Sequence, residues 1–258
     1  MNRVAVVTGA ARGIGAAVVR RLAGDGWRVV AVDACADDPA VDYPLATPAD
    51  LDDVARAGEV LPVVADVRDQ AAICDAVRKA VDQFGGLDAA VAAAAVMTGG
   101  RPLWETSDEQ WDVLNSVGLR GVLHLARAAV PALLERPAPR SGRFVALASA
   151  AAHHGLYHLA PYCAVKHGVL GLVRGLAADL RGTGVTATAV SPGSTDTAML
   201  AATAALYDLE SPERFGAQQL VDRLLQPDEI AAAVSWLCGP ESGALTGSAL
   251  MADGGFVG

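Results

Sequence analysis

The sequence contains little lysine, few aromatic residues and no excess of positive charge. Of its 258 residues, 18 are arginine but only two, Lys79 and Lys166, are lysine, and aromatic residues make up 5%. The formal net charge is −9. Because nucleic-acid binding depends on basic side chains that meet the phosphates, this balance excludes nucleic acid as a partner. The scarcity of lysine also makes the position of each lysine informative.

Long apolar runs and clustered cysteines are missing as well. No run of 18 apolar residues occurs, so we expect no membrane span. The four cysteines are far apart and fit neither a metal motif nor a disulfide framework, so we expect reduced, mostly buried thiols and no metal site. The chain enters a strand pattern at once, which leaves no room for a signal peptide, and we expect a cytoplasmic protein.

Short apolar runs alternate with helix-length segments along the whole chain. The strand-like runs are Val4–Thr8, Arg28–Asp33, Val60–Asp66, Asp88–Ala93, Arg143–Ser149, Val185–Ser191 and Ser248–Met251. The helical segments are Gly13–Asp25, Asp69–Phe84, Ser107–Glu135, Pro161–Arg181 and Pro227–Cys238. Because the runs are apolar throughout, both faces of each strand should be covered. The pattern predicts an α/β fold: a single domain over residues 1–258 with a doubly wound parallel sheet of about seven strands and helices on both faces.

Two segments are too long to be simple connections between these elements. The first, residues 34–58, follows the second strand, and the second, residues 194–226, follows the sixth. Long insertions in compact domains are often lids over a functional site. We expect the first to cover a ligand and the second to form a mobile helical flap over a substrate, although an ordinary surface insertion is the alternative for the first.

A glycine-rich turn joins the first strand to the first helix. The stretch TGAARGIG places glycines at positions 9, 13 and 15. Glycine lets the backbone turn tightly and approach a ligand, and the helix N-terminus then offers free N–H groups to a pyrophosphate. A tight turn without a ligand is the alternative. The strand–turn–helix context favours a dinucleotide site.

Two aspartates end the second and third strands. Asp33 could accept hydrogen bonds from both ribose hydroxyls of adenosine, and its charge would repel a 2′-phosphate, which favours NAD over NADP. Asp66 could hold the amino edge of adenine. A strand-end turn for the first and a helix N-cap for the second are the structural alternatives.

The stretch YCAVK places Lys166 four residues after Tyr162, on the same face of a helix. A tyrosine hydroxyl is a poor base at neutral pH, and lowering its pKa by about 3 requires roughly 4 kcal/mol, which a nearby ammonium could supply in part. Ser149 ends the fifth strand, at the edge of the sheet where ligands bind in such folds. Its hydroxyl could hold a substrate oxygen while the tyrosine moves the proton.

The stretch SPGSTDT closes the sixth strand. Pro192 and Gly193 should stop the strand and turn the chain. The backbone of Thr195 and the hydroxyl of Thr197 could then grip a carboxamide and fix the face of a nicotinamide ring, although a simple turn is the alternative.

Together these motifs resemble the short-chain dehydrogenase/reductase family, in family order and over essentially the full chain. The resemblance implies a Rossmann fold, hydride transfer between NAD(P) and an alcohol or ketone, and a homotetramer. It implies that Ser149 orients the substrate, that Tyr162 is the acid and base, and that Lys166 lowers the tyrosine pKa and holds the nicotinamide ribose. The cofactor contacts that it implies are Gly9, Arg12, Gly13, Ile14, Gly15, Asp33, Asp66, Val67, Ala93, Tyr162, Lys166, Pro192, Gly193, Thr195 and Thr197.

The insertion carries a second resemblance. Its stretch VDYPLATPADLDDV, residues 41–54, looks like the segment of mycofactocin-associated, carveol-dehydrogenase-like enzymes. That resemblance implies a lid over the adenosine of a tightly held NAD, which a mycofactocin-type redox carrier would reoxidise.

Two departures from the family pattern affect the expected activity. Ala92–Ala95 stand where the family usually has Asn-Asn-Ala-Gly, and Gly118 stands where it has an asparagine that holds a water for proton relay. A water could occupy the space vacated at Gly118, while Asn115 lies one turn away and is a poor substitute.

Two functions therefore stay open. The first is an NAD-dependent oxidoreductase for a small to medium hydrophobic alcohol or ketone, with a pocket formed by His153–Leu159, Thr98–Trp104 and the flap. The second is a dinucleotide-binding protein with weakened or lost catalysis.

Overall fold

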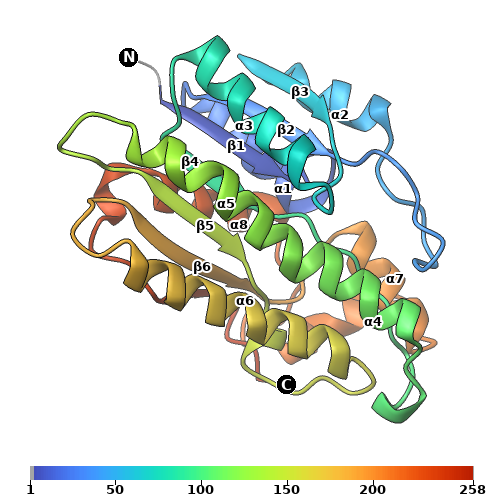
Figure 1. The fold of residues 1–258 in the computed structure, drawn as a ribbon. Helices are drawn as coiled ribbons and strands as arrows, with labels where there is room; N and C mark the ends of the chain where they lie inside the picture. The colour runs from blue at the N-terminus through green and yellow to red at the C-terminus, as the bar shows by residue number, and fades with distance from the viewer. Residues whose placement is uncertain (1–2, 258) are drawn as a thin grey trace.

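A single parallel sheet forms the centre of the protein in the computed structural model, which describes residues 3–257 (Figure 1). The strand order is β3-β2-β1-β4-β5-β6-β7, and every neighbouring pair is parallel. The strands are β1 (Val4–Thr8), β2 (Arg28–Asp33), β3 (Val60–Val64), β4 (Ala89–Ala92), β5 (Arg143–Leu147), β6 (Thr186–Pro192) and β7 (Ala249–Ala252). The predicted doubly wound, seven-stranded sheet is confirmed.

Helices cover both faces of the sheet. They are α1 (Gly13–Gly24), α2 (Pro48–Ala55), α3 (Gln70–Phe84), α4 (Asp108–Asn115), α5 (Gly121–Leu134), α6 (Ala160–Asp179), α7 (Ala198–Leu206) and α8 (Pro227–Cys238). Helices α3, α5 and α6 pack on one face, in front of the sheet in Figure 1, and α1, α2 and α8 pack on the other. This three-layer arrangement is the confirmed Rossmann architecture.

The alternation along β1 shows why its residues are all apolar. Val4 and Val6 lie in the core cluster under α3, α5 and α6, whereas Ala5 and Val7 lie in the cluster under α1 and α8. Successive side chains of a strand point to opposite faces. Since each face meets a helix layer, an apolar residue is needed at every position.

The predicted helical segment Ser107–Glu135 is confirmed as a continuous helical stretch over Asp108–Leu134, but one turn of it is not α-helical. The segment Ser116–Arg120 between α4 and α5 is a π-helical turn, and it contains Gly118. The apolar periodicity continues through it, so the sequence does not show the extra residue. Such turns interrupt α-helices mainly at functional sites, and this one lies beside α6.

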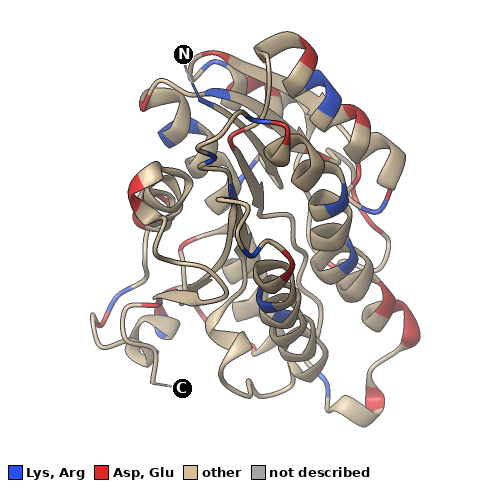
Figure 2. Ribbon diagram, turned by 60° about the vertical axis from the view of Figure 1, so that its left-hand side comes forward, with Lys and Arg blue, Asp and Glu red and all other residues tan. Residues whose placement is uncertain are grey.

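One helical stretch of the described residues, Asp108–Leu134, is long and apolar enough to cross a membrane by length and composition. Its residues Leu125, Ala129 and Leu133 are fully buried in the core cluster on the sheet. Packing within the domain therefore accounts for its apolar composition. Figure 2 shows charged residues of both signs interspersed mainly along the helices and loops.

The two long segments have structure of their own. The first contains α2, which begins at a capping box formed by Thr47 and Asp50 and buries Leu51 and Val54. The second contains α7 and the 3-10 helix η4 (Pro212–Gln218), so its predicted helical character is confirmed. Shorter 3-10 turns occur at Leu103–Glu105 (η1), Ala150–Ala152 (η3) and Pro240–Ser242 (η5).

Candidate active site

A cleft of about 930 Å³ lies at the carboxyl ends of the strands. It contains every residue that the sequence predicted for catalysis or cofactor binding. These are Gly9, Arg12, Gly13, Ile14, Gly15, Asp33, Asp66, Val67, Ala93, Ser149, Tyr162, Lys166, Pro192, Gly193, Thr195 and Thr197. The fold thus brings residues from six strand ends into one site, while their individual contacts with a ligand stay predictions.

The glycine turn has no room for side chains. A Cβ on Gly15 would lie 1.9 Å from the Gly9 carbonyl oxygen, and one on Gly9 would lie 2.6 Å from the backbone of Ala94. Gly9 also has φ +66°, a conformation that glycine adopts readily. Helix α1 then starts at Gly13 without a side-chain cap, so the N–H groups of its first turn are available to a ligand in the cleft. This arrangement fits a pyrophosphate.

Asp33 is held at the end of β2 by two backbone donors. The Ala11 N–H donates to one carboxylate oxygen at 3.0 Å, and the Cys35 N–H donates to the other at 3.1 Å. Each oxygen keeps a further lone pair for a ligand hydroxyl. The carboxylate is thereby fixed in position at the edge of the cleft.

Asp66 is engaged in a way that the sequence did not reveal. Both of its oxygens accept hydrogen bonds from Arg68, which also forms an ion pair of 2.6 Å with Asp38. Burial tends to raise the pKa of Asp66, but the hydrogen bonds and charge of Arg68 lower it overall. Arg68 therefore links the Asp66 carboxylate to the insertion. The predicted contact of Asp66 with adenine stays a prediction.

Ser149, Tyr162 and Lys166 converge where β5 meets α6. Ser149 follows β5 and caps the short helix η3, with its hydroxyl accepting from the Ala151 N–H at 3.1 Å. Its side chain also lies near enough to the Tyr162 hydroxyl to lower the pKa of that group. The Lys166 ammonium donates to the Leu147 carbonyl at 3.0 Å and lies 5.6 Å from the centre of the Tyr162 ring. The trio can therefore bind an oxygen and move its proton.

Burial shifts the pKa values of both Tyr162 and Lys166. It raises the pKa of Tyr162 to about 12, and the nearby Ser149 side chain offsets this only in part. Burial also lowers the pKa of Lys166 to about 8. Both groups are almost fully buried, so desolvation dominates each pKa. That Lys166 lowers the pKa of Tyr162 stays a prediction.

At the alanine run and at Gly118, the chain lacks the side chains that the family usually has there, and the neighbouring residues respond differently at the two places. The Thr8 hydroxyl accepts from the Ala93 N–H at 3.3 Å and lies 3.5 Å from the Val91 carbonyl, so it braces β1 against β4 beside the alanine run. Asn115 donates to the Trp111 carbonyl at 2.9 Å on its own helix. It therefore does not substitute for a side chain at Gly118, as predicted.

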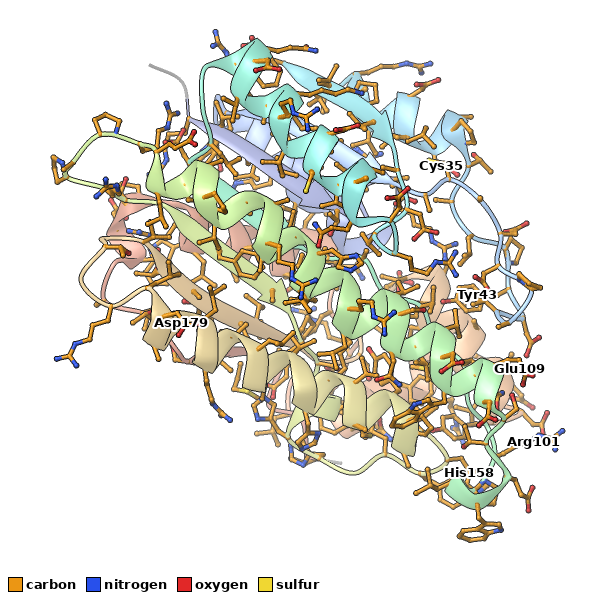
Figure 3. All side chains as sticks on the ribbon, viewed as in Figure 1. Cys35, Tyr43, Arg101, Glu109, His158 and Asp179 are labelled. Atoms are coloured by element: carbon orange, nitrogen blue, oxygen red, sulfur yellow. The ribbon has the colours of Figure 1, made fainter. Side chains whose placement is uncertain are left out.

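The loop between β2 and α2, residues 34–47, is here called the strap. It contributes Ala34, Ala36, Asp38, Leu45 and Ala46 to the cleft. Figures 1 and 3 show it extending from the sheet towards α7, with Tyr43 on it. Sequence reasoning placed the insertion near the cofactor but missed its anchoring side chains. Because the chain has only four tyrosines, four tryptophans and four phenylalanines, a tyrosine inside a polar insertion was a sign in the sequence that Tyr43 anchors it.

The end of the cleft away from the glycine turn is apolar. Its lining includes Val96, Met97, Leu156, Tyr157, Leu159, Met199, Leu200, Tyr207, Leu209, Phe215 and Phe256. Four elements supply these residues: the loop after β4, the loop before α6, the flap and the C-terminal segment. The predicted contribution of the flap to this pocket is borne out by its position.

Two predicted pocket segments need correction. From His153–Leu159, the cleft is lined by Leu156, Tyr157 and Leu159 but by none of the histidines. Instead His153 hydrogen bonds Ser191 at 2.9 Å, His154 packs on Phe256, and His158 stacks on Tyr157. In the loop after β4, the lining comes from residues 93–97 and not from Thr98–Trp104, and Trp104 is 84% exposed. Figure 3 shows His158 and Arg101 together at the outer edge of the molecule.

Comparisons with known proteins agree with this geometry. A family model described as enoyl-(acyl carrier protein) reductase matches residues 9–257. The chain belongs to the short-chain dehydrogenase/reductase family. It is 38% identical to an uncharacterized NAD-dependent oxidoreductase of Mycobacterium tuberculosis, over 99% of this chain and 96% of that one.

Two solved structures of the same family share the fold over almost the whole chain. Carveol dehydrogenase from Mycobacterium avium, in complex with NAD, is 33% identical with a TM-score of 0.92, covering 98% of this chain and 96% of the other. A short chain dehydrogenase from Mycobacterium paratuberculosis, bound to NAD, is 29% identical with a TM-score of 0.89, covering 98% and 97%. The predicted likeness to a carveol dehydrogenase is therefore confirmed.

Proposed function

We propose that this short-chain dehydrogenase/reductase interconverts a hydrophobic alcohol and the matching ketone, with NAD as its cofactor. The observation that carries the proposal is the position of Ser149, Tyr162 and Lys166 in one cleft with the glycine turn. A dinucleotide cradle and a proton-transfer group then face the same space, as hydride transfer requires.

NAD is the cofactor because of the charge at the end of β2. The fixed carboxylate of Asp33 can accept hydrogen bonds from ribose hydroxyls and repels a 2′-phosphate. The relative from Mycobacterium tuberculosis is named NAD-dependent, and both solved structures contain NAD. When bound, NAD supplies the acceptor or donor of the hydride.

The residues of the trio have distinct roles in the proposed reaction. In the direction of oxidation, the Ser149 hydroxyl holds the substrate oxygen and Tyr162, as phenolate, accepts its proton. Lys166 keeps a positive charge beside the phenolate below its pKa of about 8. The bond between hydrogen and the carbon that carries this oxygen breaks, and the hydrogen leaves with the electron pair as the hydride that bound NAD would accept. The carbon–oxygen bond thereby becomes a carbonyl. Reduction reverses each step.

The apolar lining supports an uncharged substrate. The cationic side chains that line the cleft are Arg12, Arg20, Arg68 and Lys166. The three arginines lie at the dinucleotide end, and the lysine is engaged in the trio. Since the described apolar end offers no cation to a carboxylate, a hydrophobic alcohol or ketone is favoured over an acidic one.

The strap supports a more specific proposal: NAD is retained as a bound group and reoxidised by a mycofactocin-type carrier. It crosses the dinucleotide end of the cleft and is tied to it by the Asp38–Arg68 ion pair. The likeness to carveol dehydrogenase supports the same idea. Family membership further supports a homotetramer, and the four free cysteines are consistent with a cytoplasmic protein.

The second candidate is a dinucleotide-binding protein with weak or no catalysis. Gly118 favours it, because glycine offers no side chain for a proton relay. The complete trio opposes it, so the enzyme is preferred.

Two measurements test the proposed function. The protein is purified without added cofactor, dialysed and denatured, and the released nucleotide is quantified. We expect close to one NAD per chain; no nucleotide would overturn retention but not NAD dependence. Turnover is then measured on a panel of hydrophobic alcohols, with both NAD and an artificial electron acceptor. We expect turnover that is lost in Tyr162→Phe, and tight NAD binding without any turnover would decide for the binding protein.

A further inference from the structure

Tyr43 on the strap contacts both ends of the cleft without lining it. Its side chain is partly buried, in a cluster that also contains Val41, Met97 and Tyr162. The residues that line the cleft next to it are Met97 and Arg12. The two groups on Tyr43, the ring and the hydroxyl, make separate contacts with these two residues.

The ring contacts the dinucleotide end. The Arg12 guanidinium carbon lies 5.4 Å from the centre of the Tyr43 ring, which is within the range of a cation–π contact. Arg12 also donates to the Pro44 carbonyl at 2.5 Å. Since Arg12 belongs to the glycine turn and precedes α1, the strap and the phosphate cradle hold each other in position.

The hydroxyl contacts the substrate end. The Met97 N–H donates to the Tyr43 hydroxyl oxygen at 3.0 Å. Met97 is 6% exposed and forms part of the apolar lining together with Val96. The loop after β4 has no ladder partner at this point, so the strap hydroxyl fixes the backbone that carries this wall of the pocket. Without the Tyr43 hydroxyl, the buried Met97 N–H would have no hydrogen-bond acceptor, which costs free energy. The backbone around Met97 would then shift to find another acceptor.

We propose that Tyr43 is a positioning residue that joins the two ends of the cleft, with its ring holding Arg12 at the cofactor end and its hydroxyl holding Met97 in the wall of the alcohol pocket. The inference rests on the proposed function, since it assigns the pocket beside Met97 to the alcohol. It predicts that two parts of one side chain control the binding of two different ligands.

Two substitutions separate these parts. Tyr43→Phe keeps the ring over Arg12 and removes only the acceptor for Met97, whereas Tyr43→Leu removes both. Asp42→Asn is the matched control, because Asp42 is the exposed neighbour on the same strap. For each variant, the NAD dissociation constant is measured on nucleotide-stripped protein, and kcat and KM are measured with the best alcohol of the panel.

Tyr43→Phe should raise the alcohol KM roughly 5- to 30-fold, as expected for one lost hydrogen bond, while kcat and the NAD dissociation constant change by less than about twofold. Tyr43→Leu should raise both the alcohol KM and the NAD dissociation constant. Asp42→Asn should change neither. An alcohol KM in Tyr43→Phe equal to that of the wild type would overturn the proposal. So would an equal loss of NAD and alcohol binding in Tyr43→Phe, since that outcome indicates a general packing role.

Amide hydrogen exchange provides a readout that needs no substrate. The peptide containing Met97 should exchange faster in Tyr43→Phe than in the wild type or Asp42→Asn. Unchanged exchange would refute the contact itself. If no alcohol is turned over but exchange at Met97 accelerates, the proposed function fails while the role of Tyr43 in fixing this wall stands.

Discussion

A Cβ placed on Gly118 would lie 2.8 Å from Cγ1 of Val165. Gly118 belongs to the π-helical turn between α4 and α5, and Val165 lies on α6 between Tyr162 and Lys166. Real Cβ atoms do not approach another carbon this closely, and a β-branched side chain in a helix has little freedom to move away. Val165 therefore takes up the space next to Gly118 that the first carbon of a side chain would need, and whether a water lies farther along the relay stays a prediction.

This contact predicts how the missing asparagine can be restored. Gly118→Asn alone should destabilise the protein by about 1–3 kcal/mol through overpacking. Adding Val165→Ala should recover most of that loss and raise kcat above that of the wild type, because the relay side chain then has room. Thermal unfolding and alcohol turnover of both variants check this. A double variant that folds normally without any gain in kcat would show that proton relay does not limit turnover.

Lys166 is predicted to lower stability while serving activity. Replacement by Met should abolish turnover yet stabilise the protein at pH 7 by an amount on the order of 2 kcal/mol, because an ammonium with a pKa of about 8 is buried against its preference for water. Between about pH 8 and 10.5 the folded wild type loses this proton before the unfolded chain does. Wild-type stability therefore rises with pH relative to Lys166→Met. Denaturant unfolding at pH 7 and pH 10 measures the difference in unfolding free energy between Lys166→Met and the wild type. This difference should be smaller at pH 10 than at pH 7.

The ion pair between Asp38 and Arg68 is predicted to slow the release of NAD. The Asp38 side chain is 12% exposed and lies 2.6 Å from the guanidinium. Asp38→Asn removes the charge and should speed NAD dissociation by roughly fivefold, which corresponds to about 1 kcal/mol. Displacement of bound NAD by an excess of competing nucleotide gives the rate. Equal rates in the variant, in Asp42→Asn and in the wild type would mean that the strap does not limit release.

Asp33 is predicted to select between NAD and NADP. Asp33→Asn preserves an acceptor for the Cys35 N–H but removes the negative charge that would face a 2′-phosphate. The preference for NAD over NADP, measured as a ratio of dissociation constants, should fall roughly tenfold to a hundredfold. A ratio that stays constant would indicate that another group of the cleft reads the ribose.

Features encoded within one short segment could be predicted from the sequence. The strand, glycine turn and helix of TGAARGIG need only eight consecutive residues, and Tyr162 and Lys166 share a helix face because they are four residues apart. Strand positions followed from continuous apolar runs, since both faces of the sheet are covered. The strand ends moved by one or two residues, as at β3, which ends at Val64 rather than Asp66.

Features that depend on contact between distant segments could not be predicted in this way. The helix Ser107–Glu135 retained its apolar period through the π-helical turn, so the interruption was invisible. The histidines before α6 were plausible pocket residues, but it is Leu156, Tyr157 and Leu159 of the same loop that line the cleft. The rise in the Tyr162 pKa that burial causes could not be predicted, because only packing determines burial.

The sequence by itself thus determined the fold class, the glycine turn and the candidate trio that lies in the cleft, because local spacing and polarity are sufficient for each of them. The tertiary structure alone decided that Val165 fills the place beside Gly118, that Arg68 joins Asp66 to Asp38, and that Tyr43 reaches Met97 across the cleft. The Asp38–Arg68 and Tyr43–Met97 pairs are separated along the chain by 30 and 54 residues, and these contacts arise only when the strap and the helices pack around the finished sheet.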